Sequence, residues 1–183
     1  MIERIPEKSL FKECLNQPEF ADIRFQVGNA EFHAHKVILC ARSNHFAAMF
    51  ASPSFAESTQ DVIKLSEEEM SAEIFGSLLE FVYCDTTDIN AENAMELLHH
   101  ASFYNLNHLF EMCEQYIEEN VEPDNVLEIL KVAHALTAIH LTAFCLNYLV
   151  KNGEALFNIK DTWEEIKEDI QWQLRSQIEQ IIW

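Results

Sequence analysis

The spacing of apolar residues changes its period once in the first third of the chain. From residue 22 to 27 apolar and polar residues alternate, which is the pattern of a half-buried strand. Gly28-Asn29 is a turn pair typical of tight hairpins, and a short return strand is expected at residues 31–34. From residue 36 to 50 the apolar positions take helical spacing instead. The pattern therefore predicts a β-hairpin that leads into an apolar helix.

Helical spacing dominates the remainder of the chain. A short amphipathic helix is expected at residues 7–16, a strand at 62–65 and a second short strand at 88–90. Asn107 and Asp124 are expected to cap the helices that they begin. The low counts of glycine (3) and proline (4) argue against a linker-rich or all-β chain. Further helices are predicted near residues 71–84, 91–104, 107–117, 124–134, 139–150 and 161–183.

The hairpin and the helix after it carry a spaced series of residues: Asp22, Phe25, Val27, Phe32, Ala34-His35-Lys36, Leu39, Ser43, Phe46 and Phe50. In this order and spacing the series resembles the BTB/POZ domain family. Phe-Val-Tyr-Cys at residues 81–84 also occupies the place of the F-x-Y-T stretch common in BTB domains. The resemblance runs to about residue 117.

The resemblance implies an α+β architecture of the BTB/POZ fold, in which a small β-sheet is flanked by a cluster of α-helices and followed by an all-α C-terminal extension. We expect the BTB/POZ domain, including an N-terminal dimerisation helix, at residues 1–120 and the extension at 121–183. The extension resembles the 3-box, the start of a BACK region, which widens the cullin groove of many cullin-binding BTB proteins. Residues 161–183 form either a final packing helix or a surface for a partner. The chain ends on Ile-Ile-Trp without a polar tail, which is compatible with a fragment of a longer protein.

The charge of the chain is strongly negative and unevenly spread. Its formal net charge is −19, and between Lys64 and Lys131 sixteen Asp and Glu residues occur without any Lys or Arg. Nucleic-acid binding depends on Lys and Arg that neutralise phosphates, so DNA, RNA and anionic membranes are excluded as direct partners. Two interpretations remain open: the charge keeps a hydrophobic protein soluble, or it steers the chain toward a basic partner surface.

The cysteines indicate a reducing compartment. Five cysteines are scattered along the chain without a C-x-x-C pair, and Cys40, Cys113 and Cys145 each fall on an apolar helical face. The charged N-terminus lacks the apolar core of a signal peptide, and no apolar run approaches the length of a membrane span. We therefore expect a cytosolic or nuclear protein.

A homodimer follows from the resemblance. In BTB proteins the helix that matches residues 7–16 packs across the partner subunit, whereas the alternative is that it packs on its own core. An acid at residue 22 and a base at residue 36 could be mistaken for a catalytic pair. In this family, however, both Asp22 and Lys36 lie near the dimer interface, and a buried charge persists only if it is paired. We interpret them as a structural pair. The expected interface residues are Leu10, Phe11, Cys14, Leu15, Asp22, Lys36, Val37, Cys40 and Asn44.

A cullin contact is the second implication of the resemblance. BTB proteins that recruit cullin-3 commonly carry a hydrophobic-x-Glu pattern in the loop that Phe55-Ala56-Glu57 would occupy. An exposed aromatic residue there can fill a pocket on a partner, but it can also tuck against its own domain. Tyr104 lies where related adaptors make a second cullin contact, and its alternative role is to cap the core. The expected cullin-binding residues are Met49, Phe50, Phe55, Glu57, Tyr104 and Asn105.

No pattern points to chemistry. His99 and His100 are adjacent on a helix and project about 100° apart, so they cannot both bind one metal ion without help, and no zinc spacing surrounds them. An enzyme would need Cys113 or Cys40 as a nucleophile with a nearby His as its base, yet Cys113 lies in the stretch without Lys or Arg. We predict no catalytic residue, no metal and no cofactor.

The predicted function is that of a protein–protein interaction module: a homodimeric BTB adaptor that recruits a substrate or partner to a cullin-3 RING ubiquitin ligase. The alternative is a BTB module for dimerisation, scaffolding or corepressor binding that does not bind cullin. No kelch, ankyrin, MATH or zinc-finger pattern is present. Either the helical tail or a partner chain would therefore select the unknown substrate, or no substrate is recruited.

Overall fold

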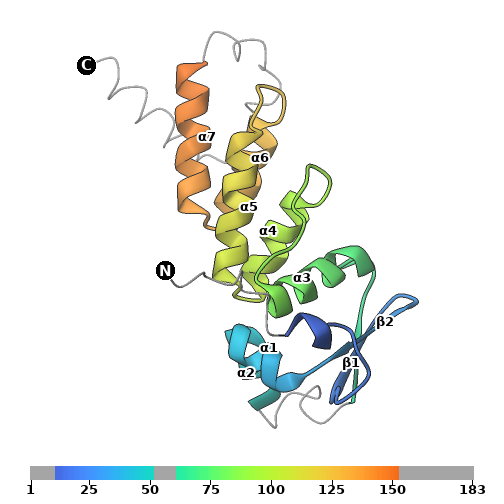
Figure 1. Ribbon diagram of the computed structural model, residues 1–183. Coiled ribbons are helices and arrows are strands. Elements are labelled where there is room, and N and C mark those ends of the chain that lie inside the picture. Colours follow the sequence, from blue (N-terminus) through green and yellow to red (C-terminus); the bar gives the residue numbers. More distant parts are fainter. Residues whose placement is uncertain (1–10, 52–60, 153–183) are drawn as a thin grey trace, which may run out of the picture. The chain divides into compact units, whose positions relative to one another are not determined.

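Three strands form one mixed sheet in the computed structural model, which describes residues 11–51 and 61–152 (Figure 1). The strand order is β2-β1-β3, with β1 (Ile23–Val27) in the centre. β2 (Ala30–Ala34) pairs antiparallel with β1, and β3 (Val62–Leu65) pairs parallel with it. The predicted hairpin and the predicted strand at 62–65 are confirmed, with the return strand starting one residue early.

The hairpin turn requires glycine at residue 28. Gly28 has a φ of +56°, a left-handed backbone conformation that residues with a side chain adopt only at an energetic cost. A Cβ at this position would also collide with the carboxylate of Glu67, so that flexible side chain would have to move to accept any other residue.

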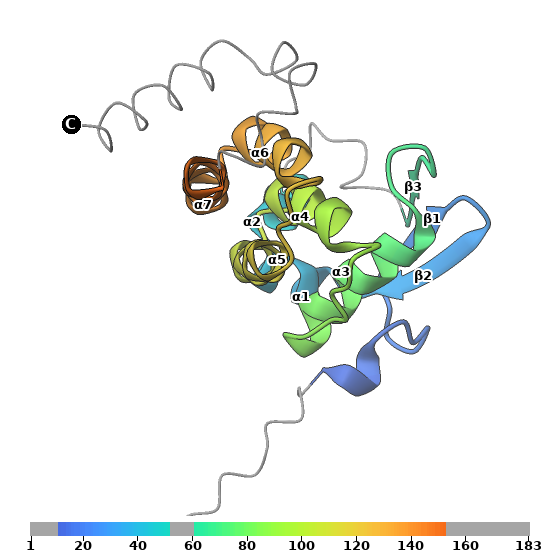
Figure 2. The same cartoon turned by 90° about the horizontal axis from the view of Figure 1, so that it is seen from above.

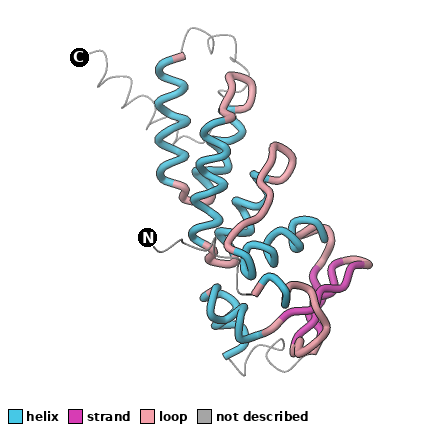
Figure 3. The backbone as a smooth tube through the Cα atoms, viewed as in Figure 1, coloured by secondary structure: helices cyan, strands magenta, loops and turns pink. Residues whose placement is uncertain are grey.

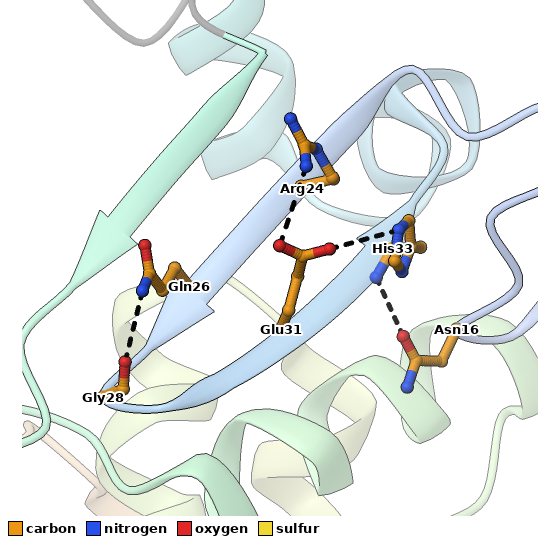
Figure 4. A network of polar contacts seen from close by, with 6 residues as sticks. All are labelled: Asn16, Arg24, Gln26, Gly28, Glu31 and His33. Carbon is orange, nitrogen blue, oxygen red and sulfur yellow. Dashed lines mark hydrogen bonds and ion pairs between the residues drawn. The ribbon is translucent and has the colours of Figure 1, made fainter.

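The two faces of the hairpin follow the alternation of the sequence. Ile23, Phe25 and Val27 of β1 are buried. On the other face Glu31 joins Arg24 at 3.6 Å and His33 at 3.4 Å in an exposed polar network (Figure 4). Period-two alternation thus places the core on one side of the sheet and charged groups on the other.

Helices make up most of the remaining described chain (Figure 3). The predicted helices at 71–84, 91–104, 107–117, 124–134 and 139–150 are confirmed, with ends shifted by a few residues. The helices are the 3₁₀ helix η1 (Lys12–Cys14) and the α-helices α1 (Lys36–Arg42), α2 (Asn44–Ala51), α3 (Ala72–Cys84), α4 (Ala94–Phe103), α5 (Asn107–Glu119), α6 (Val126–Ala135) and α7 (Ile139–Lys151).

The single apolar helix predicted over residues 36–50 is wrong, because Ser43 divides it into α1 and α2. Ser43 is extended, with φ −138° and ψ 120°, and the backbone N–H of Phe46 donates to its Oγ at 3.2 Å. Serine is a preferred residue before the first turn of a helix because its hydroxyl accepts one of the free N–H groups there. Apolar spacing continues through this break, so the pattern alone could not reveal it.

The predicted helix at residues 7–16 is also wrong within its described part. Residues 7–10 lie outside the described residues; beyond η1, Leu15 is extended and Asn16 has a φ of +51°. The Asn16 side chain instead accepts a hydrogen bond from the backbone N–H of His33 at 2.8 Å (Figure 4). Asn16 therefore covers part of the outer edge of β2, a role that requires a turn and not a helix.

Two smaller predictions differ from the structure for a common reason: asparagine side chains hold turns there. Residues 88–90 form no strand, and Asn90 Oδ1 accepts from the N–H groups of Glu92 and Asn93. Asp124 does not cap α6; the residue before this helix is Asn125, whose Oδ1 accepts from the Glu122 N–H at 2.8 Å. Such side-chain bonds compete with regular structure at these positions.

The described residues divide into two compact units, one up to Glu111 and one from Met112 onward, with the division inside α5. In the first unit α3 lies against the sheet (Figure 2), where the Phe75 ring is 4.9 Å from Phe25 and 5.1 Å from Phe32. The domain boundary predicted at residue 120 stays a prediction.

In the second unit α6 and α7 run side by side (Figures 1 and 2). Leu130 and Leu141 are fully buried, and the buried carboxylate of Glu114 accepts from the Leu141 N–H at 3.3 Å in the first turn of α7. None of the described helices is long and apolar enough to cross a membrane.

The start of α1 is held by a side chain from outside the helix. His35 precedes α1 and makes no side-chain cap, but the backbone N–H of Lys36 donates to Asp22 Oδ1 at 2.7 Å. Asp22 thus satisfies a free N–H group of the helix and places a negative charge at its positive end. Asp22 and Lys36 do form a structural contact, made through the backbone of Lys36.

We expect Asp22→Ala to lower the free energy of unfolding by about 1 kcal/mol, because the Lys36 N–H loses its partner at the helix start. The measurement is a urea titration at one fixed protein concentration. Lys36→Met is the matched control, since it retains the backbone N–H and should change stability far less. Equal losses for the two variants would show that the side-chain charges, and not the cap, hold this contact.

Candidate functional site

The described residues offer little for catalysis or metal binding. No three His, Cys, Asp or Glu side chains among residues 11–51 and 61–152 come together as a possible metal site. Burial raises the pKa of the Cys113 and Cys145 thiols to about 12, and for Cys145 the carboxylate of Glu118 adds to the shift. Burial and then Asp22 also raise the pKa of Cys40, against an opposing effect of Lys36. A thiol must ionise to act as a nucleophile, so these three are poorly suited to that role.

Aromatic side chains of α2 and of the turn between α4 and α5 form one cluster, which we call the aromatic cluster. It consists of His45, Phe46, Phe50, Phe103 and Tyr104. The ring of Phe46 is its centre, stacked 4.9 Å from Tyr104 and 6.1 Å from Phe50. The fold therefore brings together Phe50 and Tyr104, two predicted cullin-binding residues that are far apart in the sequence.

Tyr104 is part of the core. Its side chain is only 5% exposed, and burial, with a contribution from Glu69, raises its pKa to about 12. Its backbone carbonyl accepts a hydrogen bond from the hydroxyl of Ser43 at 2.6 Å. The sequence left two roles open for Tyr104, a cullin contact or a cap of the core, and this geometry supports the second.

The other predicted cullin-binding residues differ in accessibility. Asn105 is exposed, with a φ of +54°, and Met49 and Phe50 are half-buried. The ammonium group of Lys36 lies 5.3 Å from the centre of the Phe50 ring, a cation–π contact. Phe55 and Glu57 lie outside the described residues.

Sequence reasoning missed Phe103, which is 57% exposed although it neighbours the buried Tyr104. Its ring lies 4.7 Å from His45 and 5.0 Å from Tyr104. One signal was available: Phe103 falls four and seven residues after His99 and Glu96, away from the buried stripe of Leu97, Leu98 and Ala101.

The predicted dimer residues lie on the N-terminal segment and on α1. Val37 is 74% exposed and Phe11 is 45% exposed, so both large apolar side chains are accessible to a partner. Cys14, Leu15, Lys36 and Cys40 are half-buried, Asp22 and Asn44 are exposed, and Leu10 lies outside the described residues.

Phe20 is a further exposed residue of this segment that sequence reasoning missed. It is 85% exposed and has a φ of +63°, a conformation that is rare and strained for a bulky residue. The backbone carbonyl oxygen of the neighbouring Glu19 lies 3.3 Å from Nε2 of the buried His35. The other ring nitrogen of His35, Nδ1, lies 2.9 Å from the Tyr83 hydroxyl. Polar contacts thus fix the backbone here while the Phe20 ring remains in solvent.

Comparisons with known proteins agree on one family. A model of the BTB/POZ domain matches residues 11–121. Kelch repeat and BTB domain-containing protein 4 of Homo sapiens is 31% identical over 118 residues, which make up 64% of this chain and 22% of that protein. Its counterpart in Macaca fascicularis is 32% identical over 114 residues, or 62% and 20% of the two chains. This chain thus spans about a fifth of the length of the curated relatives it matches.

A search of solved structures finds the BTB domain of zebrafish PATZ1. It superimposes with a TM-score of 0.47 at 27% identity, over 55% of this chain and 77% of that one.

We expect Cys113 and Cys145 to react with a chromogenic disulfide reagent at pH 8 at least about tenfold more slowly than a thiol of ordinary pKa. A pKa of about 12 leaves these thiols almost wholly protonated at that pH, and burial blocks access. The measurement is labelling of the native chain followed by peptide mass mapping, with the chain in urea as the fully reactive control. Rapid labelling of Cys113 in the native chain would contradict this and reopen the case for an enzyme.

Proposed function

The chain belongs to the BTB/POZ domain family, a family of protein-interaction modules, and on that premise we propose that it is a homodimeric adaptor that recruits a protein substrate to a cullin-3 RING ubiquitin ligase. The single observation that carries this proposal is the coexistence of two accessible apolar surfaces with an absence of catalytic geometry among the described residues. One surface includes Val37 and Phe11, and the other includes Phe103, the exposed member of the aromatic cluster.

The dimer half of the proposal rests on the N-terminal segment and α1. Val37, Phe11 and Phe20 expose large apolar area that an isolated chain would leave in water. Burying apolar area contributes about 25 cal/mol per Å², so a second copy that covers these side chains gains affinity from each of them. The polar contacts of Asn16 and Asp22 hold this segment in place for such an interface.

The cullin half rests on the loop after α2. Residues 52–61 join α2 to β3 and include Phe55-Ala56-Glu57, which matches the hydrophobic-x-Glu pattern of cullin-3 adaptors. The motif follows Met49 and Phe50 closely in the sequence, and we propose that these residues contact the same cullin molecule. Phe55 would fill an apolar pocket and Glu57 would accept a hydrogen bond.

The proposal includes no catalysis by this chain and no direct contact with nucleic acid or membrane. The net charge of −19 opposes binding to phosphate groups. The free thiols fit a cytosolic or nuclear location, where cysteines stay reduced.

The deciding experiment is a calorimetric titration of the purified chain with the N-terminal domain of cullin-3, after its mass is measured by light scattering. Binding at one cullin per chain within a dimer supports the adaptor. An intact dimer that gives no heat at two temperatures would leave a dimerisation or corepressor-binding module.

We expect the double variant Phe55→Ala/Glu57→Ala to weaken cullin binding by about tenfold or more, because truncation of a central aromatic contact commonly costs over 1 kcal/mol. Calorimetry measures the affinity, and light scattering checks that the mass is unchanged. An unaltered affinity would remove these two residues from the contact.

We expect Val37→Glu to weaken the dimer by about tenfold or more, because it places an unpaired carboxylate in an apolar interface. Sedimentation equilibrium over a range of concentrations measures the dissociation constant. Ile139→Glu is the matched control, since Ile139 is 72% exposed but belongs to the second unit. Equal dimer strength in both variants would place the interface away from α1.

A further inference from the structure

The two edges of the sheet differ in how they are covered. At the edge formed by β2, the backbone N–H of His33 donates to Asn16 Oδ1 at 2.8 Å. The other edge is formed by β3 (Figure 2), and no hydrogen bond within residues 11–51 and 61–152 reaches its outward side. An edge strand presents a row of free N–H and C=O groups that can pair with another extended chain. In the described part of the chain, β3 is therefore the open edge.

The pairing with β1 determines which backbone groups of β3 are free. The backbone N–H of Arg24 donates to the carbonyl of Asp61 at 2.9 Å, and Arg24 is the register partner of Val62. In a parallel ladder a residue bonds to the two neighbours of its register partner, so residues 61, 63 and 65 direct their backbone groups toward β1. The N–H and C=O groups of Val62 and Lys64 consequently point away from the sheet.

The side chains of Val62 and Lys64 lie on the outer face of the sheet. Ile63 between them is buried on the inner face, and successive side chains of a strand alternate between the faces. Val62 is half-buried, whereas Lys64 is exposed and forms no ion pair with any other described residue. The open edge thus carries an apolar side chain and a free ammonium group two residues apart.

Lys64 opposes pairing of this edge with a second copy of the chain. If two β3 strands pair antiparallel through their outward groups, Val62 lies opposite Lys64 of the second copy, and the two Lys64 side chains become diagonal neighbours. Such like charges repel, and a lysine on an edge strand is a common device against self-association. An acidic residue opposite Lys64 forms a cross-strand ion pair instead. Charge complementarity therefore favours an acidic strand as the occupant.

We propose that β3 is a docking edge for an extended acidic segment of a partner protein, which adds antiparallel to the sheet as a further strand. An Asp or Glu of this segment lies opposite Lys64, and the residue two positions later, an apolar one, lies opposite Val62. The free backbone groups provide affinity, and the two side chains select the sequence acidic-x-apolar. The inference goes beyond the proposed function, because none of the expected dimer or cullin residues lies on β3 (Val62–Leu65).

The test titrates the full chain with the peptide acetyl-Ser-Thr-Glu-Thr-Val-Thr-Ser-amide and follows the backbone amides by NMR. Binding should shift the amides of β3 and saturate. Lys64→Glu should weaken binding about fivefold or more, because it turns an attraction into a repulsion, and a peptide with Lys in place of its Glu should restore binding to that variant. Lys151→Glu is the matched control, since Lys151 is exposed and belongs to the second unit.

N-methylation of the peptide separates the backbone contribution from the charge. On the Glu of the peptide it removes the N–H that donates to the carbonyl of Lys64, and it should weaken binding about fivefold or more. The same modification on the Thr between Glu and Val is the control. The N–H of that Thr points away from β3, so affinity should stay within about twofold.

Amide hydrogen exchange of the free chain tests the open edge without any peptide. The N–H groups of Val62 and Lys64 should exchange faster than that of Ile63, which the ladder with β1 protects, and the peptide should slow them. Equally slow exchange of all three in the free chain would show a covered edge and overturn the proposal. A peptide that shifts no amide of β3, or that Lys64→Glu and Lys151→Glu affect alike, would overturn it too. These measurements use no cullin, so their failure leaves the adaptor proposal standing.

Discussion

The hydroxyl of Ser43 makes the contact on which the arrangement of the first unit depends. It donates to the carbonyl of Tyr104, 61 residues later, and accepts from the N–H of Phe46, both inside the core. A buried polar group without partners would cost about 1–3 kcal/mol, so this serine can occupy its site only if both partners are present. One side chain thereby ends α1, begins α2 and fixes the turn after α4. The aromatic cluster forms because α2 and this turn are held together.

Polar contacts of this kind hold the edges of the fold and leave apolar side chains free. Asn16 binds the edge of β2, Asp22 caps α1, and the carbonyl of Glu19 meets the buried His35. None of these contacts uses the rings of Phe11 or Phe20, which remain exposed. A segment fixed through its backbone and small polar groups can present its large apolar groups to another molecule. Such a segment, with a fixed backbone and exposed apolar side chains, fits a family whose members act by binding proteins.

The aromatic cluster shows how burial sorts residues that are adjacent in the sequence. Phe103 and Tyr104 touch at 5.0 Å, yet one is 57% and the other 5% exposed. The helix ends between them, and adjacent residues point in directions about 100° apart. The inner ring stabilises the core and supports the outer ring, so the accessible surface at this turn depends on residues that no partner would touch. The adjacent residues His99 and His100 differ in the same way: His99 is exposed and His100 is buried.

The sequence by itself determined the hairpin, the identity of β3, the helices α3 to α7 and the family. These features depend on local periodicity, on turn residues such as Gly28-Asn29, and on a long spaced signature, all of which can be read without knowing what packs against them. The tertiary structure decided the break at Ser43, the turn at Asn16, and the exposure of Phe103 and Phe20. In three of these cases a partner remote in the sequence contacts the residue: Tyr104 contacts Ser43, His33 contacts Asn16, and His45 contacts the ring of Phe103. Periodicity shows which face of a helix is apolar, but only the packed fold shows whether another element covers it.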